Sequence, residues 1–295
     1  MRSRWLVESK LAIAAGAACE RPLPPLDANL PTERLRLLLA YDGRAFSGWQ
    51  SQPTGEGVQD HLRQALGAIT RFDLPVIGSG RTDAGVHALG QVAHVDVPAG
   101  RYSMETWQRA LNANLPGPVR VLRCRKAPFS FHAQHSAKCK TYVYRVCLGP
   151  VLHPFELGRA WHYHQPITGL QTLAAACELL TGTHDFAAFA ANRGQPERTT
   201  VRTLYTVQAR HQRALLTLRF EGNGFLYRMV RLLTGSLMQV ATARQTLAWL
   251  RGLLDATPGQ KANHCAPPDG LYLCRVRYAV KKVSEYRGDG VGRGR

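Results

Sequence analysis

Apolar and polar residues alternate along several segments of the first half of the chain, and this pattern predicts strands. Residues 35–41 form a mostly apolar run that ends at an Asp-Gly pair typical of turns. Residues 91–97 alternate between apolar and polar side chains, as in a half-buried strand. The segments 119–125 and 138–148 also have the character of strands. We therefore expect a sheet in this part of the chain.

Apolar residues at helical spacing predict two helices among these strands. The first covers about 58–70, where apolar side chains recur every three or four positions. The second follows Ser103, whose hydroxyl can cap a helix N-terminus, and ends at the Pro-Gly-Pro sequence 116–118. Strands and helices therefore alternate irregularly and lack the regular strand–helix repeat of a doubly wound parallel sheet.

The second half of the chain repeats this mixture in a looser form. Helices are expected at 168–180, 225–240 and 245–254. Strands are expected at 201–210, 214–220 and 271–278. We predict an α+β fold with two similar domains, each a mostly antiparallel sheet with helices packed on one side.

The predicted domain boundaries divide the chain into four parts. An N-terminal extension, 1–32, precedes a domain at 33–137 and a second domain at 138–280. The last part, 281–295, is charged and rich in glycine. We expect both ends to be disordered. The N-terminal stretch superficially resembles a signal peptide, but charged residues interrupt its apolar run, so we do not predict export.

The large positive charge of the protein indicates which class of molecule it binds. The net charge is +18 and the isoelectric point is near 10.2, which favours a polyanion. Nucleic acid is the first candidate and an anionic membrane the second. No apolar run approaches the ~20 residues of a membrane span, and the basic residues are spread along the chain, so we predict no membrane association. Charge alone also fits a protein that excess arginine keeps soluble.

The cysteines and histidines give no sign of a metal site or of disulfides. Seven cysteines, an odd number, are irregularly spaced and form no C-x-x-C sequence. This usage is typical of reduced thiols in a cytoplasmic protein. A neighbouring His-Cys pair does not have the spacing of metal ligands, so no metal is predicted.

One glycine-rich stretch, 78–87, holds the most suggestive chemistry. Three glycines surround Arg81 and Asp83, so the carboxylate is expected on a tight turn that leads into a strand. A phosphate-binding loop does not fit, because Asp83 stands where G-x-G-x-x-G requires glycine. Composition alone favours a simple hairpin turn, since turn aspartates are common. The other reading is a catalytic carboxylate on a rigid base.

Most common catalytic signatures are absent from the chain. It lacks the motifs of metal hydrolases, of nucleotide-phosphate and dinucleotide enzymes, and the G-x-S-x-G elbow of a serine hydrolase. What remains is one carboxylate on a glycine loop, nearby arginines and aromatic side chains. That set suits an aspartate nucleophile acting on a nucleic-acid base.

The sequence G-R-T-D-A-G-V-H-A at 80–88, followed by G-Q-V at 90–92, resembles the catalytic loop of the tRNA pseudouridine synthases of the TruA family. The resemblance extends over about 34–278, in family order. Its other blocks lie at 41–43, 46, 48–50, 57–59, 131–133, 142, 144, 184–186, 222–226, 229–231, 235 and 266–271. The N-terminal extension and the glycine-rich tail have no clear counterpart.

The resemblance implies a pseudouridine synthase fold with a basic cleft between two domains. It implies isomerisation of uridine to pseudouridine in the anticodon stem-loop of tRNA, without metal or organic cofactor. The family also implies a cytoplasmic homodimer, with tRNA crossing both subunits. A synthase acting on a different RNA is one alternative. A non-catalytic RNA-binding protein on the same scaffold is another, although it leaves the aspartate unexplained, because a carboxylate repels phosphate.

Site roles follow from the same resemblance, residue by residue. Asp83 would be the nucleophile, and Arg231 would pair with it and keep it ionised. Tyr142 would stack on the detached uracil, and Arg81 would hold the target nucleotide out of the stem. Whether Asp83 attacks the base or the sugar stays open. The remaining expected substrate-binding residues are His87, Gln91 and Leu226.

Overall fold

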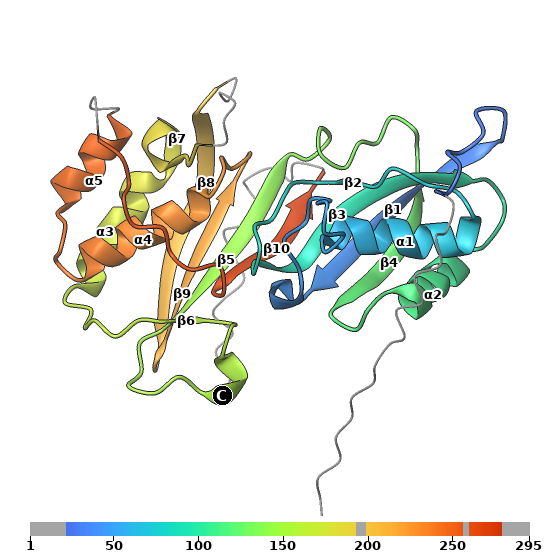
Figure 1. Cartoon of the computed structure of the whole chain (residues 1–295). Helices are drawn as coiled ribbons and strands as arrows, with labels where there is room; N and C mark the ends of the chain where they lie inside the picture. Colours follow the sequence, from blue (N-terminus) through green and yellow to red (C-terminus); the bar gives the residue numbers. More distant parts are fainter. Residues whose placement is uncertain (1–21, 193–198, 256–259, 279–295) are drawn as a thin grey trace, which may run out of the picture.

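A single sheet runs through both halves of the computed structural model, which describes residues 22–192, 199–255 and 260–278 (Figure 1). The main strand order is β4-β1-β3-β10-β5-β9-β8-β7. Short β2 pairs with β3, and β6 pairs with β5. The predicted α+β class with mostly antiparallel strands is confirmed. Most of the predicted extension and all of the predicted tail lie outside the described residues.

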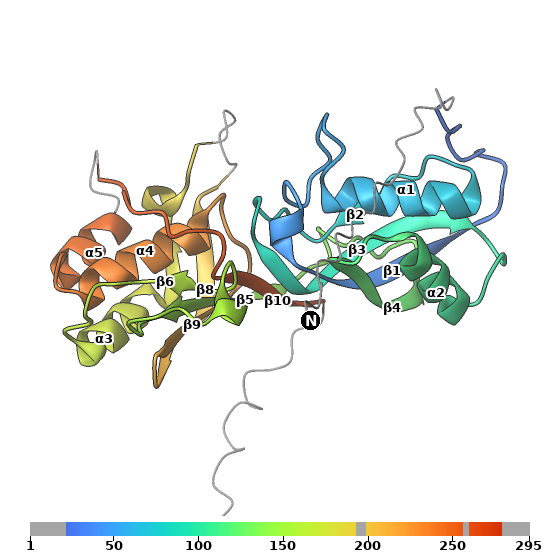
Figure 2. The same cartoon turned by 60° about the horizontal axis from the view of Figure 1, so that its bottom comes forward.

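The strands of the two halves meet at β10. The first half supplies β1 (Thr32–Tyr41), β2 (Ile77–Gly78), β3 (His87–Pro98) and β4 (Val119–Ala127). The second supplies β5 (Cys139–Cys147), β6 (Trp161–His162), β7 (Gly182–Asp185), β8 (Val201–Gln212) and β9 (Leu215–Gly222). β10 (Leu271–Arg277) pairs parallel with β3 and antiparallel with β5. The turned view shows it where the two halves meet (Figure 2). The predicted domain boundary before residue 138 stays a prediction, because the sheet continues across it.

Each half carries its own helices beside its strands (Figure 1). The first half has α1 (Val58–Thr70) and α2 (Met104–Asn114). The second has α3 (Leu170–Leu180), α4 (Met229–Ala241) and α5 (Leu247–Leu254). The expected cap of α2 is present, since Ser103 Oγ accepts a hydrogen bond from Thr106 N at 3.2 Å. Single turns of 3-10 helix lie at Gly43–Ala45, Pro154–Glu156 and Ala187–Phe189.

Two element boundaries differ from the sequence prediction for a visible reason. The strand β1 begins before its apolar run, because its ladder with β3 continues to the pair Thr32 and Pro98. The helix expected from residue 225 begins only at Met229. The preceding residue, Arg228, has a left-handed backbone with φ of 57°, which cannot continue an α-helix.

The core is built from the alternation that the sequence displays. In β1, Leu35, Leu37 and Leu39 are fully buried while the residues between them are partly exposed. Each such leucine contributes roughly 1.5–3 kcal/mol relative to an exposed position. Within the described ranges, none of the helices combines the length and the apolar character that crossing a membrane requires.

Candidate active site

The loop between β2 and β3, residues 79–86, presents Asp83 on a tight turn. Val86 N donates to Asp83 O at 3.1 Å, and Gly85 takes φ of +80° in the turn. That backbone conformation favours glycine, which explains this glycine of the motif. We call this segment the aspartate loop. Its predicted tight turn is confirmed.

Buried hydrogen bonds hold the aspartate loop from the first half of the molecule. Trp49 N donates to Thr82 O at 3.0 Å, and the hydroxyls of Thr82 and Tyr41 lie 2.8 Å apart. Gly43 packs so closely on Val86 O that a side chain at residue 43 would collide with it. The loop is therefore fixed on a rigid base next to Asp83.

Gln91 and His87 lie behind the aspartate loop and not among the residues that line the cavity described below. Gln91 is fully buried, accepts from Ser79 Oγ at 2.6 Å and donates to Gly80 O at 2.9 Å. His87 is 3% exposed, and its Nδ1 accepts from Gly43 N at 3.1 Å. The hydrogen-bonding atoms of both residues are engaged by the protein, and their expected contact with the substrate stays a prediction.

The ring of His87 is neutral in this setting. Its Nε2 donates to Gly158 O at 2.9 Å, and the ring stacks on Tyr272 with centroids 4.6 Å apart. Burial lowers the pKa of His87, an effect that the nearby Asp42 carboxylate only partly offsets. Asp42 itself pairs with Arg44 at 2.6 Å, and that pairing lowers the pKa of Asp42 to about 2.

Arg231 of the second half reaches across and pairs with Asp83 of the first half. Its Nη1 lies 2.9 Å from Asp83 Oδ2, and its Nε donates to Ala266 O at 2.8 Å. The Arg231 side chain is 12% exposed and that of Asp83 is 20% exposed. The ion pair is therefore partly desolvated, which strengthens it relative to a surface pair. The contact expected from the resemblance is present.

A second arginine, Arg228, lies near the carboxylate of Asp83. Its Nε lies 4.0 Å from Asp83 Oδ2, and its side chain is 43% exposed. Its guanidinium lies 5.0 Å from the ring centre of Tyr227. Left-handed backbone at a residue other than glycine often marks a functional site. The sequence prediction did not include Arg228, although its position three residues before Arg231 could have indicated it.

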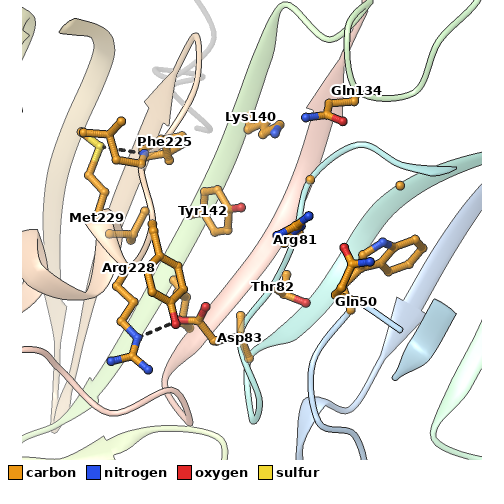
Figure 3. A pocket seen from close by; sticks show the side chains of 18 of the residues that line it. Gln50, Arg81, Thr82, Asp83, Gln134, Lys140, Tyr142, Phe225, Arg228 and Met229 are labelled. Atoms are coloured by element: carbon orange, nitrogen blue, oxygen red, sulfur yellow. Dashed lines mark hydrogen bonds and ion pairs between the residues drawn. The ribbon is translucent and has the colours of Figure 1, made fainter. Parts of the chain in front are cut away.

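A cavity of about 860 Å³ opens beside Asp83, between the two halves (Figure 3). Asp83, Arg231, Tyr142, Arg81 and Leu226 all line it, so the structure brings together five of the seven expected site residues. The other lining residues are Trp49, Gln50, Gln59, Val76, Ile77, Gly78, Gly80, Thr82, Val86, Gln134, Lys140, Arg202, Phe225, Tyr227, Arg228, Met229, Val230 and Leu271.

Tyr142 and Leu226 give this cavity an apolar wall. The Tyr142 ring meets Phe225 edge to face, with ring centroids 5.0 Å apart. Burial raises the pKa of Tyr142, and Tyr41 and Asp83 add to this effect, so its hydroxyl is neutral. Arg81 is exposed at the side of the cavity. The arrangement can hold a flat ring against Tyr142, within the same cavity as a carboxylate.

Metal binding has no visible basis in the described part of the chain, where no cluster of three or more His, Cys, Asp or Glu side chains is arranged around a common point. The six cysteines within the described ranges are free thiols.

Comparison with known proteins decides the family. A family model described as tRNA pseudouridine synthase matches residues 38–136 and 176–279, which include Asp83 and Arg231. The chain belongs to this family. A protein named tRNA pseudouridine synthase A from Akkermansia muciniphila is 45% identical over 253 residues, covering 83% of this chain and 95% of that protein.

Other relatives agree with this assignment. The tRNA pseudouridine synthase A of Methylacidiphilum infernorum is 40% identical and is covered over its full length, with 87% of this chain aligned. That of Paraburkholderia phymatum is 43% identical, with 83% of this chain and 91% of the relative aligned. Among solved structures, a chain of a Cbf5-Nop10-Gar1 complex matches with a TM-score of 0.32 and 12% identity, over 70% of this chain and 45% of that one.

Proposed function

We propose that this chain isomerises uridine to pseudouridine in the anticodon stem-loop of tRNA, with Asp83 as the nucleophile. Membership of the family supports the reaction and the tRNA substrate. The observation that carries the assignment of Asp83 is its ion pair with Arg231 on the wall of a cavity that also presents Tyr142.

The chemistry is an isomerisation, so it is redox-neutral overall and needs no net oxidant or reductant. A carboxylate oxygen of Asp83 attacks either C1′ of the ribose or the uracil ring, and the N1–C1′ bond breaks. The uracil turns, a C5–C1′ bond forms, and the bond between the substrate and Asp83 breaks, which restores the free carboxylate. The proton on C5 is lost, and N1 ends as N–H, so atoms and charge balance. Arg231 donates a hydrogen bond to the attacking carboxylate at 2.9 Å and so holds it in position beside the substrate.

Tyr142 and Leu226 retain the uracil while it is detached from the sugar. Stacking on an aromatic ring is worth about 1–3 kcal/mol per base and does not prevent rotation in the plane of the ring. Arg81 holds the target nucleotide outside the stem. Extruding a nucleotide costs a few kcal/mol of stacking and pairing. Contacts between the RNA backbone and the +18 protein offset that cost.

The test is to incubate the protein with an unmodified tRNA transcript and map pseudouridine by chemical labelling. The proposal expects product within the anticodon stem-loop. Product confined to another RNA would identify a synthase with a different substrate. Tight binding without product in any RNA would support the non-catalytic alternative.

We also propose that the protein acts as a homodimer, as the family resemblance suggests. Val151, Phe155 and Leu157 are exposed apolar side chains in one connecting segment, and exposed apolar patches often mark contact surfaces. Light scattering is expected to give about twice the chain mass of 32.6 kDa. A mass equal to one chain would contradict this. A cytoplasmic location stays a prediction.

A further inference from the structure

Lys140 lies in the wall of the cavity away from the nucleophile and has no part in the mechanism above. It precedes Tyr142 by two residues on β5, so the two side chains point to the same face of the sheet. Figure 3 places it with Gln134 at one end of the cavity, and Asp83 with Arg228 at the other. The two ends of the cavity therefore carry different side chains.

The Lys140 ammonium is desolvated without an anion to neutralise it. Among the described residues, no carboxylate lies within ion-pair distance of its Nζ. A Cβ atom at Gly80 would lie 2.6 Å from Nζ, so the ammonium packs against the backbone of the aspartate loop. Burial lowers the pKa of Lys140 to about 8, and the charge of Arg202 contributes to the shift.

The other charged groups around this ammonium do not supply the missing anion. The cavity-lining cations are Arg81, Arg202, Arg228 and Arg231. Asp83 is the one carboxylate among the described lining residues, and it is already paired with Arg231.

The carboxylate on the neighbouring strand β9, that of Glu221, makes its contacts on the opposite face of the sheet. Glu221 accepts a hydrogen bond from Thr141 Oγ1 at 3.3 Å, and Thr141 points away from the face that carries Lys140. Glu221 also pairs with Arg219 at 2.8 Å. A partly buried cation that lacks a counter-charge is costly unless a ligand supplies one.

We propose that Lys140 forms a phosphate-binding subsite that holds an RNA phosphodiester next to the nucleotide in the cavity. This inference rests on the proposed function for the identity of the ligand. Lysine binds phosphate as a point charge and suits a linkage whose oxygens point in several directions. Holding that linkage fixes the RNA strand in register, so that the neighbouring uridine reaches Tyr142 and Asp83.

The first experiment measures how salt weakens binding of a fluorescent tRNA transcript to purified protein. Wild type is compared with Lys140→Met, which keeps the length of the side chain, and Lys140→Arg, which keeps its charge. Lys261→Met is the matched control, because Lys261 is exposed and does not line the cavity. Lys140→Met is expected to reduce the log–log salt slope by about 0.7–0.9, as for the loss of one phosphate contact. Lys140→Arg and Lys261→Met are expected to keep the wild-type slope.

The pH dependence of binding distinguishes a direct contact between Lys140 and the RNA from a purely structural role of Lys140. Wild-type affinity is expected to fall roughly tenfold between pH 7 and pH 9, as the free ammonium loses its proton near the pKa of about 8. Lys140→Arg keeps its charge and is expected to lose little affinity over this range. A transcript with one neutral methylphosphonate linkage beside the target uridine is expected to bind wild type more weakly than the unmodified transcript does. Lys140→Met is expected to bind the two transcripts with the same affinity, because the contact to that phosphate is already lost.

The outcomes that overturn the subsite are distinct from failure of the proposed function. Equal salt slopes and equal pH profiles for wild type and Lys140→Met, in variants with unchanged melting temperature, would remove Lys140 from RNA binding. Binding is measured without turnover, so an inactive wild type would refute the proposed reaction and leave the binding test intact.

Discussion

The cavity-facing residues of the aspartate loop and the first residues of β3 behind it differ sharply, although they are close neighbours in the sequence. On the cavity side, Arg81 is exposed, and the side chain of Asp83 is 20% exposed beside Arg231. On the inner side, His87 and Gln91 are buried, and protein atoms engage their hydrogen-bonding groups. The comparison teaches that the motif combines a cavity-facing charged surface with its own buried support. Changes on the cavity side should reduce activity more than stability, whereas changes on the inner side should reduce stability first.

The largest effect among the residues around Asp83 is expected for Arg231→Leu. Losing the charge that stabilises a reacting group typically costs about 10²–10³-fold in rate. We expect a loss of this size in single-turnover pseudouridine formation, measured well below a melting temperature that also falls, because the variant loses the partly buried ion pair and the hydrogen bond to Ala266 O. Arg251→Leu, on the exposed face of α5, is the matched control. An unchanged rate in Arg231→Leu would mean that the ion pair is only structural.

Tyr142 sharpens the comparison, because its ring and its hydroxyl can be separated. Tyr142→Phe keeps the ring and is expected to retain most of the activity. Tyr142→Ala removes the ring and is expected to lose roughly 10–100-fold, the equivalent of one lost stacking contact. Single-turnover rates on the same transcript measure both variants. Equal losses in the two would show that the hydroxyl is what matters.

Gln91→Ala tests the inner side. The change leaves Ser79 Oγ and Gly80 O without their buried partner, which costs about 1–3 kcal/mol of unfolding free energy. Urea unfolding measures this loss. Well below the melting temperature, we expect the rate to fall less than for Arg231→Leu. Gln208→Ala, at an exposed position on β8, serves as control. A large loss of rate at full stability would place Gln91 on the substrate side after all.

The smallest effect expected is a pH dependence of stability that comes from His87. Its pKa in the fold lies below the ordinary value of 6.5, so the unfolded chain takes up the proton first as the pH falls. The contribution of the neutral His87 ring to the free energy of unfolding is fully present above pH 6.5. It is lost as the pH decreases through the lower pKa that His87 has in the folded protein. His94, whose pKa burial lowers to about 4, acts in the same direction.

Urea unfolding between pH 7 and pH 5 measures this dependence. The expected slope from His87 is at most about 1.4 kcal/mol per pH unit, the value for one proton. His87→Gln should therefore show a shallower decline than wild type. Parallel curves for the two proteins would contradict the neutral, buried state of the ring.

Local patterns predicted the elements that local physics determines. The alternation in β1, the periodicity of α1 and the cap at Ser103 all appear in the structure as expected. The tight turn at Asp83 follows from its glycines in the same way. These features depend on neighbours a few residues apart, which a sequence displays directly.

Contacts between distant segments were not available from such patterns. Asp83 and Arg231 are 148 residues apart, and only the family resemblance suggested their pairing. Nothing in the sequence of β10 indicates that it lies between β3 and β5, because a strand pattern does not specify its neighbours. Likewise, the cavity position of Lys140 becomes visible only where the two halves meet.

The most direct test of the central claim is the single-turnover rate of Asp83→Asn on a tRNA transcript, measured with its affinity for the same transcript. The substitution keeps the shape of the side chain and removes the nucleophilic charge. We predict a loss of roughly 10⁴-fold or more in pseudouridine formation, typical of removing a nucleophile, with a dissociation constant close to that of wild type. Turnover by Asp83→Asn at the wild-type rate would contradict the account.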